Sequence, residues 1–259
     1  MPEGDAVHRT AAKLRRALDG HVLTRSDFRV PRHATADLSG RRVLENLSRG
    51  KHLLTRVEGD LTVHTHLRME GSWQIFPARA WLPRGDQVRL VLATAEVQAV
   101  GIRLGMVDLL RTADEDRVVG HLGPDLLGPD WDAEEAVARL LRTPERTIGE
   151  ALLDQRNLAG IGTIYRAETL FLRGVWPWRP VGEVNDLVGL VSLAQRLLEA
   201  NKDRAGAVTT GDRRQGRERW VYGRAGRPCR RCGGRISRGE MGANPQERLI
   251  LWCGHCQPR

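Results

Sequence analysis

Seven residues, Arg156-Asn157-Leu158-Ala159-Gly160-Ile161-Gly162, decide how the second half of the chain folds. They stand between two helical patterns, residues 147–155 and 163–172, and are too few for more than a pair of turns. Further helices are expected from the capping residue Asp132 through Leu141, and over residues 185–200. The sequence therefore predicts a helical domain built around this short connection.

The first half of the chain shows a different pattern. Residues 3–18 are expected to form an amphipathic helix whose apolar side chains share one face: Val7, Ala11, Leu14 and Leu18. Short β-rich runs follow, punctuated by Gly and Asp, at residues 41–47, 51–57, 61–66, 87–94, 97–102 and 106–110. Their spacing predicts an antiparallel sandwich or barrel, so the fold class is α+β.

All four cysteines lie near the end of the chain. The pairs Cys229-x-x-Cys232 and Cys253-x-x-Cys256 are separated by twenty residues, which suits a β-hairpin that returns the second pair to the first. We expect a zinc ribbon with one structural zinc ion per chain. A redox dithiol and disulfides are the alternatives, but nothing in the sequence suggests an oxidising compartment. Residues 201–228, rich in Gly and Arg, are expected to be a mobile basic connector.

The chain is basic, with 41 Lys and Arg against 32 Asp and Glu and a formal charge of +9. This charge favours polyanionic partners, DNA or RNA first, although the dominance of Arg over Lys also fits the codon bias of a GC-rich genome. No apolar run approaches the roughly 20 residues of a membrane span, and the polar N-terminus does not resemble a signal peptide. We expect a cytoplasmic, nucleoid-associated protein that does not bind membranes.

The opening Met1-Pro2-Glu3-Gly4-Asp5 resembles the formamidopyrimidine-DNA glycosylase/endonuclease VIII family, and its Pro-Glu-Gly form is closer to the endonuclease VIII branch. Three more motifs follow in family order: Arg49-Gly50-Lys51 before a strand, Leu158–Gly162 in the helix–two-turn–helix, and Arg248–Cys256 in the zinc finger. The resemblance covers essentially the whole chain. It implies an N-terminal helix plus β-sandwich domain (1–128), a helix–two-turn–helix domain (129–222) and a zinc ribbon (223–259).

The activity that the resemblance implies is a bifunctional DNA glycosylase and AP lyase of base excision repair, with Pro2 as nucleophile. Removal of Met1 would expose a secondary amine. Its pKa of about 8 means that a fraction of the amine is neutral at physiological pH. Attack on C1′ of a deoxyribose gives an iminium cation, and β- and then δ-elimination cleave the strand. Glu3 would protonate the ring oxygen and relay protons. Without this resemblance, Pro2 would be interpreted only as a residue that starts a helix. Glu3 would be interpreted only as a carboxylate that the helix dipole stabilises.

The resemblance also assigns DNA contacts. Lys51 and Arg248 would hold neighbouring phosphates beside the damaged nucleotide. Extruding that nucleotide leaves a hole, and Arg68-Met69-Glu70 occupies the position of the family's void-filling loop, where endonuclease VIII has Gln-Leu-Tyr. Met69 is the candidate wedge, with a buried residue at a strand end as the alternative.

Gly162 and Thr163 open the helix at residues 163–172, where the family usually has Asn after Gly-x-Gly. The Thr163 hydroxyl and the backbone N–H groups of the helix start can still contact a phosphate. Residues 205–211 of the connector resemble the segment that covers the flipped base. The expected partner is damaged DNA, single- or double-stranded, with oxidised pyrimidines favoured, bound by a monomer. A non-catalytic damaged-DNA binder and an RNA-binding zinc-ribbon protein are the competing hypotheses.

Overall fold

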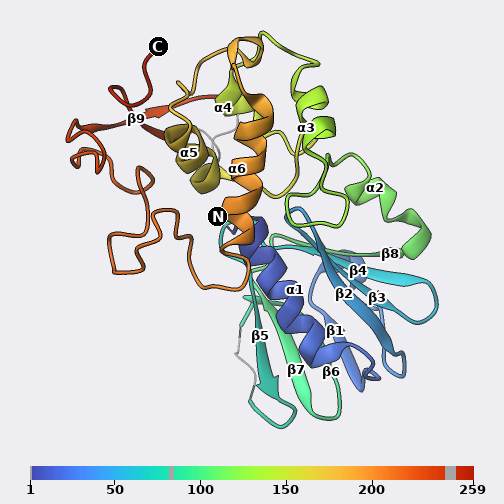
Figure 1. The fold of residues 1–259 in the computed structure, drawn as a ribbon. Helices are drawn as coiled ribbons and strands as arrows, with labels where there is room; N and C mark the ends of the chain where they lie inside the picture. The colour runs from blue at the N-terminus through green and yellow to red at the C-terminus, as the bar shows by residue number, and fades with distance from the viewer. Residues whose placement is uncertain (1, 82–84, 243–248) are drawn as a thin grey trace. The chain divides into compact units, whose positions relative to one another are not determined.

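The structure is a computed structural model that describes residues 2–81, 85–242 and 249–259 (Figure 1). Its internal contacts divide the chain into two units. The first contains Pro2 and residues 6–121, and the second contains residues 3–5 and 122–259. In the part of the chain described, no helix is long and apolar enough to cross a membrane.

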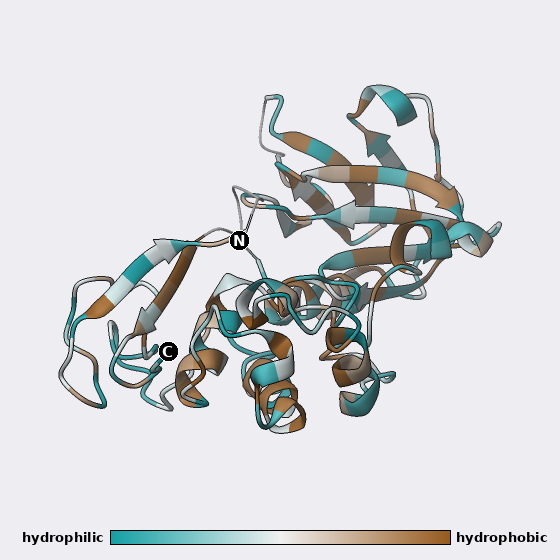
Figure 2. Ribbon diagram, turned by 90° about the horizontal axis from the view of Figure 1, so that it is seen from above, coloured by the Kyte–Doolittle hydropathy of each residue, from teal (hydrophilic) through white to brown (hydrophobic). Residues whose placement is uncertain are grey.

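Two four-stranded antiparallel sheets build the first unit, with strand orders β1-β6-β7-β5 and β2-β3-β4-β8. The strands are β1 (Arg25–Phe28), β2 (Val43–Arg49), β3 (His52–Val57), β4 (Leu61–His66), β5 (Ser72–Pro77), β6 (Val88–Ala93), β7 (Val97–Ile102) and β8 (Met106–Arg111). Hydrophobic and hydrophilic residues alternate along many strands in Figure 2, because successive side chains point to opposite faces. One apolar cluster with members from both sheets, among them Leu53, Val63, Leu90 and Leu92, forms the core.

Helix α1 (Gly4–Leu18) packs its apolar face against this core. Val7, Ala11, Leu14 and Leu18 are all buried, as their spacing predicted. Three short helical turns, η1 (Pro31–His33), η2 (Thr112–Asp114) and α2 (Asp116–Val119), complete the unit. The predicted α+β class and antiparallel sheets are confirmed.

The second unit is helical and ends in a two-stranded hairpin. Its elements are α3 (Ala133–Leu140), α4 (Ile148–Ala151), α5 (Thr163–Leu172), η3 (Val181–Glu183), α6 (Leu187–Glu199), β9 (Ile236–Glu240) and β10 (Leu249–Cys253). Asp132 caps α3 as expected, accepting hydrogen bonds from the N–H groups of Glu134 and Glu135. Helix α4 is a single turn rather than the predicted 147–155, because the Asn157 amide donates to the Ala151 carbonyl (2.9 Å) and the chain turns away there.

Candidate active site

The carboxylate of Glu3 occupies the N-terminal end of helix α5. Its Oε2 accepts hydrogen bonds from the backbone N–H groups of Gly162 (2.8 Å) and Tyr165 (3.3 Å), and its Oε1 accepts one from Ile164 (2.7 Å). Glu3 is only 2 % exposed. The first N–H groups of a helix lack partners within the helix and carry its positive dipole end, so an anion there is stabilised. Two motifs that are far apart in the sequence, the N-terminus and the turn before α5, therefore meet at one point.

Two glycines make this approach possible. A Cβ on Gly162 would lie 2.4 Å from Cδ of Glu3, so only glycine leaves space for the carboxylate. Gly160 has a φ of +102°, which side-chain-bearing residues rarely adopt, and its carbonyl accepts a hydrogen bond from the N–H of Gly4 (2.8 Å). The end of the Arg156–Gly162 segment thus binds residues 3 and 4.

Pro2 precedes Glu3 by one peptide bond and is partly buried. Because consecutive Cα atoms lie about 3.8 Å apart across a trans peptide, the hydrogen-bonded Glu3 confines the position of the Pro2 ring. Met1 and Arg248, both singled out in the sequence, lie outside the described residues.

Thr163, the residue that replaces the family's Asn, is buried at the first position of α5. Its hydroxyl lies 3.4 Å from the hydroxyl of Tyr222, to which it donates a long hydrogen bond. Two hydroxyl groups therefore stand together at the helix start that also holds Glu3. Tyr222 was not singled out in the sequence.

Lys51 and Gly50 form the tight β2–β3 turn, in which Gly50 has a φ of +57°. Its side chain is only 5 % exposed, so it is a buried residue of the first unit rather than a solvated lysine at a strand edge. It lies close enough to His66 to contribute to the low pKa of that imidazole. A lysine held in a buried position is suited to bind an anion.

Neutral histidines extend from Lys51 across the β2-β3-β4-β8 sheet. His52 Nδ1 lies 2.8 Å from His64 Nε2, and the ring of His66 packs edge-on against His52 at 5.0 Å between centroids. Burial, followed by the charges of His66, His64, His121 and Arg68, lowers the pKa of His52 to about 3. Burial, followed by Arg68, Lys51 and His64, lowers the pKa of His66 to about 4. Both imidazoles are therefore neutral at physiological pH.

The candidate wedge loop begins at His66. Its Nδ1 accepts the backbone N–H of Arg68 (2.9 Å), and Arg68 has a φ of +53°. The N–H of Gly71 donates to the carbonyl of Leu67 (2.9 Å), which closes a tight turn. Met69, between these contacts, is 47 % exposed. The structure thus excludes the alternative that Met69 is a core residue and presents its side chain to solvent.

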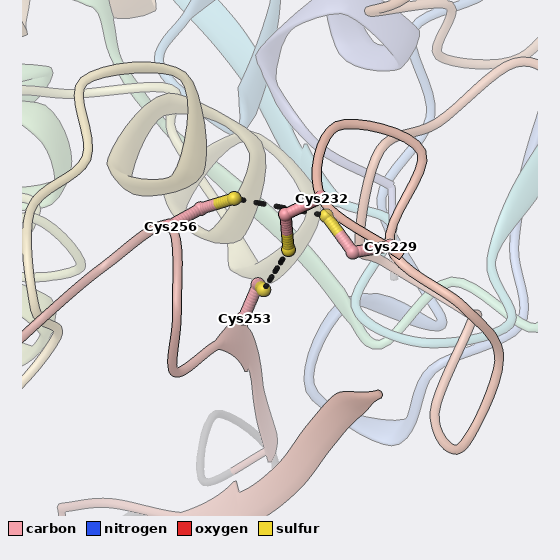
Figure 3. Close-up of side chains that lie close together, drawn as sticks. All are labelled: Cys229, Cys232, Cys253 and Cys256. Carbon is pink, nitrogen blue, oxygen red and sulfur yellow. Dashed lines mark hydrogen bonds between the residues drawn. The ribbon is translucent and has the colours of Figure 1, made fainter. Parts of the chain in front are cut away.

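The four cysteines gather at the end of the second unit, as Figure 3 shows. All four sulfur atoms lie within 4.8 Å of one another, with 3.9 Å between Cys229 and Cys256 and 3.5 Å between Cys232 and Cys253. Among the described residues, this is the one set of three or more potential ligands gathered closely enough to hold a metal ion. Four thiols at this spacing match the tetrahedral sulfur site that zinc prefers.

A cation would also satisfy the electrostatics of this site. Burial, and then the neighbouring thiols of Cys232, Cys229 and Cys253, raise the pKa of the Cys256 thiol. Thiolates crowded together repel one another unless a cation lies between them.

Arg231, within the first Cys-x-x-Cys, places its guanidinium 4.6 Å from the centre of the Phe171 ring. This contact attaches the cysteine loop to α5.

The connector between α6 and the cysteines is anchored rather than loose, which corrects the expectation of a mobile segment. The Asn201 side chain donates to the Val208 carbonyl (3.0 Å) and accepts the Val208 N–H (2.9 Å). Further along, the N–H groups of Trp220, Val221 and Tyr222 all donate to the carboxylate of Glu168 on α5. Composition alone suggested mobility because it does not reveal these contacts, and Glu168 lies more than fifty residues away along the chain.

Sequence reasoning missed Glu168, Tyr222 and Arg166. The signal available for Glu168 was its position between Ile164 and Leu172 at helical spacing, where a carboxylate interrupts an apolar stripe. Arg166 is fully buried and donates to the carbonyls of Gly149 and Leu249, the latter being the first residue of β10. Helix α5 therefore holds Glu3, the connector and the hairpin at once.

Comparison with known proteins gives matches along the whole chain. The formamidopyrimidine-DNA glycosylase N-terminal domain matches residues 1–121, and the H2TH domain of the same family matches residues 122–199. "Probable endonuclease 8 2" of Streptomyces coelicolor is 58% identical over 99% of this chain and 94% of its own length. "DNA-(apurinic or apyrimidinic site) lyase Nei2" of Mycolicibacterium smegmatis is 49% identical over 99% of both chains.

Solved structures show the same fold. The Lactococcus lactis Fpg in complex with DNA containing an abasic site superposes with a TM-score of 0.82 at 23% identity, covering 99% of this chain and 100% of that one. MutM bound to DNA with carbocyclic 8-oxo-G gives 0.83, also at 23% identity, covering 100% of both chains. The domain matches and the full-length relatives lead to one conclusion: the chain belongs to the formamidopyrimidine-DNA glycosylase family.

Proposed function

We propose that this protein is a bifunctional DNA glycosylase and AP lyase of base excision repair that acts on oxidised bases, with pyrimidines favoured. The observation that carries the proposal is the seat of Glu3 on the N–H groups of Gly162, Ile164 and Tyr165, one peptide bond from Pro2. The names of the endonuclease 8 and AP lyase relatives support the activity. The Pro-Glu-Gly opening, shared with the endonuclease VIII branch, supports the preference for pyrimidines.

The chemistry begins with the secondary amine that removal of Met1 would leave on Pro2. Its nitrogen forms a bond to C1′ as the bond from C1′ to the base breaks, and the carboxylate of Glu3 takes the proton that this nitrogen loses and delivers it to the ring oxygen as the sugar opens. The iminium cation accepts the electron pair left by the C2′ proton, so the 3′ phosphate departs, and a second elimination releases the 5′ phosphate. Glu3, fixed by three N–H groups, is suited to stay close to the cationic intermediate.

Contacts to DNA come from both units in this proposal. In the first unit, Lys51 binds a phosphate next to the damaged nucleotide, Arg68 supports the loop, and Met69 fills the hole left by extrusion. In the second, Gly162 and Thr163 contact the backbone from the start of α5. Arg248 clamps the adjacent phosphate, as the family resemblance implies.

The cysteine site is proposed to hold one structural zinc ion, with Cys229, Cys232, Cys253 and Cys256 as ligands. Zinc supplies folding energy to the hairpin rather than chemistry to the reaction. The protein is proposed to act as a monomer in the cytoplasm of a bacterium, at the nucleoid.

Borohydride trapping tests the proposal. Purified protein, with removal of Met1 verified by mass spectrometry, is mixed with labelled oligonucleotides that carry an abasic site, an oxidised pyrimidine or 8-oxoguanine, each single- and double-stranded. We expect a covalent complex with abasic and oxidised-pyrimidine DNA, and its loss in Pro2→Gly or when Met1 is retained and blocks the Pro2 nitrogen. A complex of equal yield in protein that retains Met1 would refute the role of Pro2.

The substituted wedge triplet and Thr163 favour one second candidate, a non-catalytic protein that binds abasic sites on the same scaffold. Tight binding to abasic DNA without a trapped complex or strand cleavage, in protein lacking Met1, would support that candidate instead.

A further inference from the structure

The carboxylate of Glu168 lies at the centre of a hydrogen-bond cluster inside the second unit. Oε1 accepts the backbone N–H groups of Val221 (2.8 Å) and Tyr222 (2.7 Å). Oε2 accepts the N–H of Trp220 (2.8 Å) and the hydroxyl of Thr209. Glu168 is fully buried. Three successive N–H groups that converge on one anion form the concave backbone arrangement that binds anions elsewhere in proteins.

These four donors are suited to an ionised carboxylate. Burying a carboxylate is costly unless hydrogen bonds replace its water, and hydrogen bonds to a charged acceptor are about twice as strong as neutral ones. A neutral side chain of the same shape would offer fewer acceptor sites to the same N–H groups. The two acceptor oxygens of Glu168 therefore hold residues 220–222 against α5.

The cluster closes the base of a loop. Thr209 and Glu218 are joined by a backbone hydrogen bond of 2.7 Å, and Thr209 and Trp220 both donate to Glu168 Oε2. Residues 209–220 thus form a loop, and the carboxylate of Glu168 on α5 binds both of its ends. The same region borders a cavity of about 340 Å³, whose lining includes Arg213, Glu218 and Arg219 of this loop.

Tyr222 connects Glu168, in the middle of α5, with the start of the same helix. The Tyr222 N–H is bound by Glu168, and the Tyr222 hydroxyl lies beside the hydroxyl of Thr163. Thr163 stands between Gly162 and Ile164, two of the residues that hold Glu3. One side chain in the middle of α5 therefore fixes the connector relative to the end of the helix where the proposed chemistry occurs.

We infer that Glu168 is a positioning residue that locks the connector loop onto α5, so that the loop is held ready for an extruded base. This inference rests on the proposed glycosylase function. It predicts that the lock matters for excision of a base, which the loop must cover, and matters much less for cleavage at an abasic site, where no base is present.

The test compares Glu168→Gln with the wild-type protein. The Gln amide keeps one acceptor oxygen but turns an NH2 group toward backbone donors. Glu134→Gln, an exposed carboxylate-to-amide change on α3 of the same unit, is the matched control. Thr209→Val removes one donor from the loop side without altering α5, and remains informative if Glu168→Gln folds poorly. Circular dichroism and zinc content verify that each variant is folded.

Hydrogen exchange and single-turnover kinetics are the two readouts. In DNA-free Glu168→Gln, the amides of residues 220–222 are expected to exchange about tenfold faster or more, with a smaller effect in Thr209→Val. Base excision from an oxidised-pyrimidine duplex is expected to fall about tenfold, while cleavage of a preformed abasic site falls less than about threefold.

Unchanged exchange at residues 220–222 in folded Glu168→Gln, or equal losses in both reactions, would overturn the inference. Failure of the proposed function has a different signature, because the wild-type protein itself would then trap no DNA while the exchange result still reports on the lock.

Discussion

Replacing Glu3 with Gln should destabilise the second unit, because the structure uses both carboxylate oxygens. Oε1 binds the N–H of Ile164 at 2.7 Å, whereas Oε2 binds those of Gly162 at 2.8 Å and Tyr165 at 3.3 Å. A Gln side chain has one acceptor oxygen. If that oxygen serves Gly162, the NH2 group faces the N–H of Ile164, and two donors oppose each other in a buried place.

The size of the effect follows from the bonds lost. A hydrogen bond to a charged group contributes about 1.5–3 kcal/mol, and an anion at a helix N-terminus adds about 0.3–1 kcal/mol. The long bond to Tyr165 adds little. We therefore expect Glu3→Gln to lower the free energy of unfolding by about 2–4 kcal/mol.

Asp132→Asn is the matched control. At the start of α3 both N–H donors, from Glu134 (2.9 Å) and Glu135 (3.1 Å), bind the same oxygen of Asp132. Asn retains one such oxygen and caps helices as well as Asp, so a change below about 0.5 kcal/mol is expected. Urea unfolding followed by tryptophan fluorescence gives the free energies, and hydrogen exchange at residues 162–165 locates the loss. If Glu3→Gln costs no more than Asp132→Asn, the reasoning from the two oxygens is refuted.

Three further outcomes can be measured on the same protein. Met69→Ala should weaken binding to an abasic duplex about tenfold in fluorescence anisotropy, with less effect on single-stranded DNA; an equal loss for both would argue against a wedge. Cys232→Ser should lower both the zinc content measured by atomic absorption and the melting temperature, and unchanged zinc would contradict the ligand assignment. Stability should fall as the pH drops from 6.5, the ordinary histidine pKa, toward the folded values of about 3 for His52 and about 4 for His66, because the unfolded chain binds protons first. Urea unfolding at pH 7 and pH 5 measures this change in the free energy of unfolding, and the change should be smaller in His52→Gln.

Periodicity was sufficient to find the elements that have one apolar face or a full strand pattern. Helix α5 was predicted with its observed bounds, and α1 within one residue. The two missed strands, β1 and β5, are the two edges of one sheet. An edge strand pairs on one side only, so its sequence is less constrained; Arg25-Ser26-Asp27-Phe28 carries little apolar pattern.

The candidate site was predicted from motifs, and its assembly was not. The sequence placed Glu3 and Gly162 in separate motifs, 159 residues apart, and no local rule joins them. Helix α5 buries Arg166, Glu168 and Thr169, which composition assigns to solvent. Their partners lie as far as 83 residues away along the chain. Such polar contacts depend on tertiary folding, which a single sequence does not reveal.

The division of the chain has a consequence for dissecting the protein. Residues 3–5 cluster with residues 122–259, although helix α1 continues from them into the first unit. A fragment that begins at Leu122 would therefore lack both the carboxylate at the start of α5 and the Gly4 N–H that binds Gly160. We expect such a fragment to fold fully only when a short synthetic peptide with the N-terminal residues is added to it. The peptide would then supply, as a separate molecule, the contacts that cap helix α5.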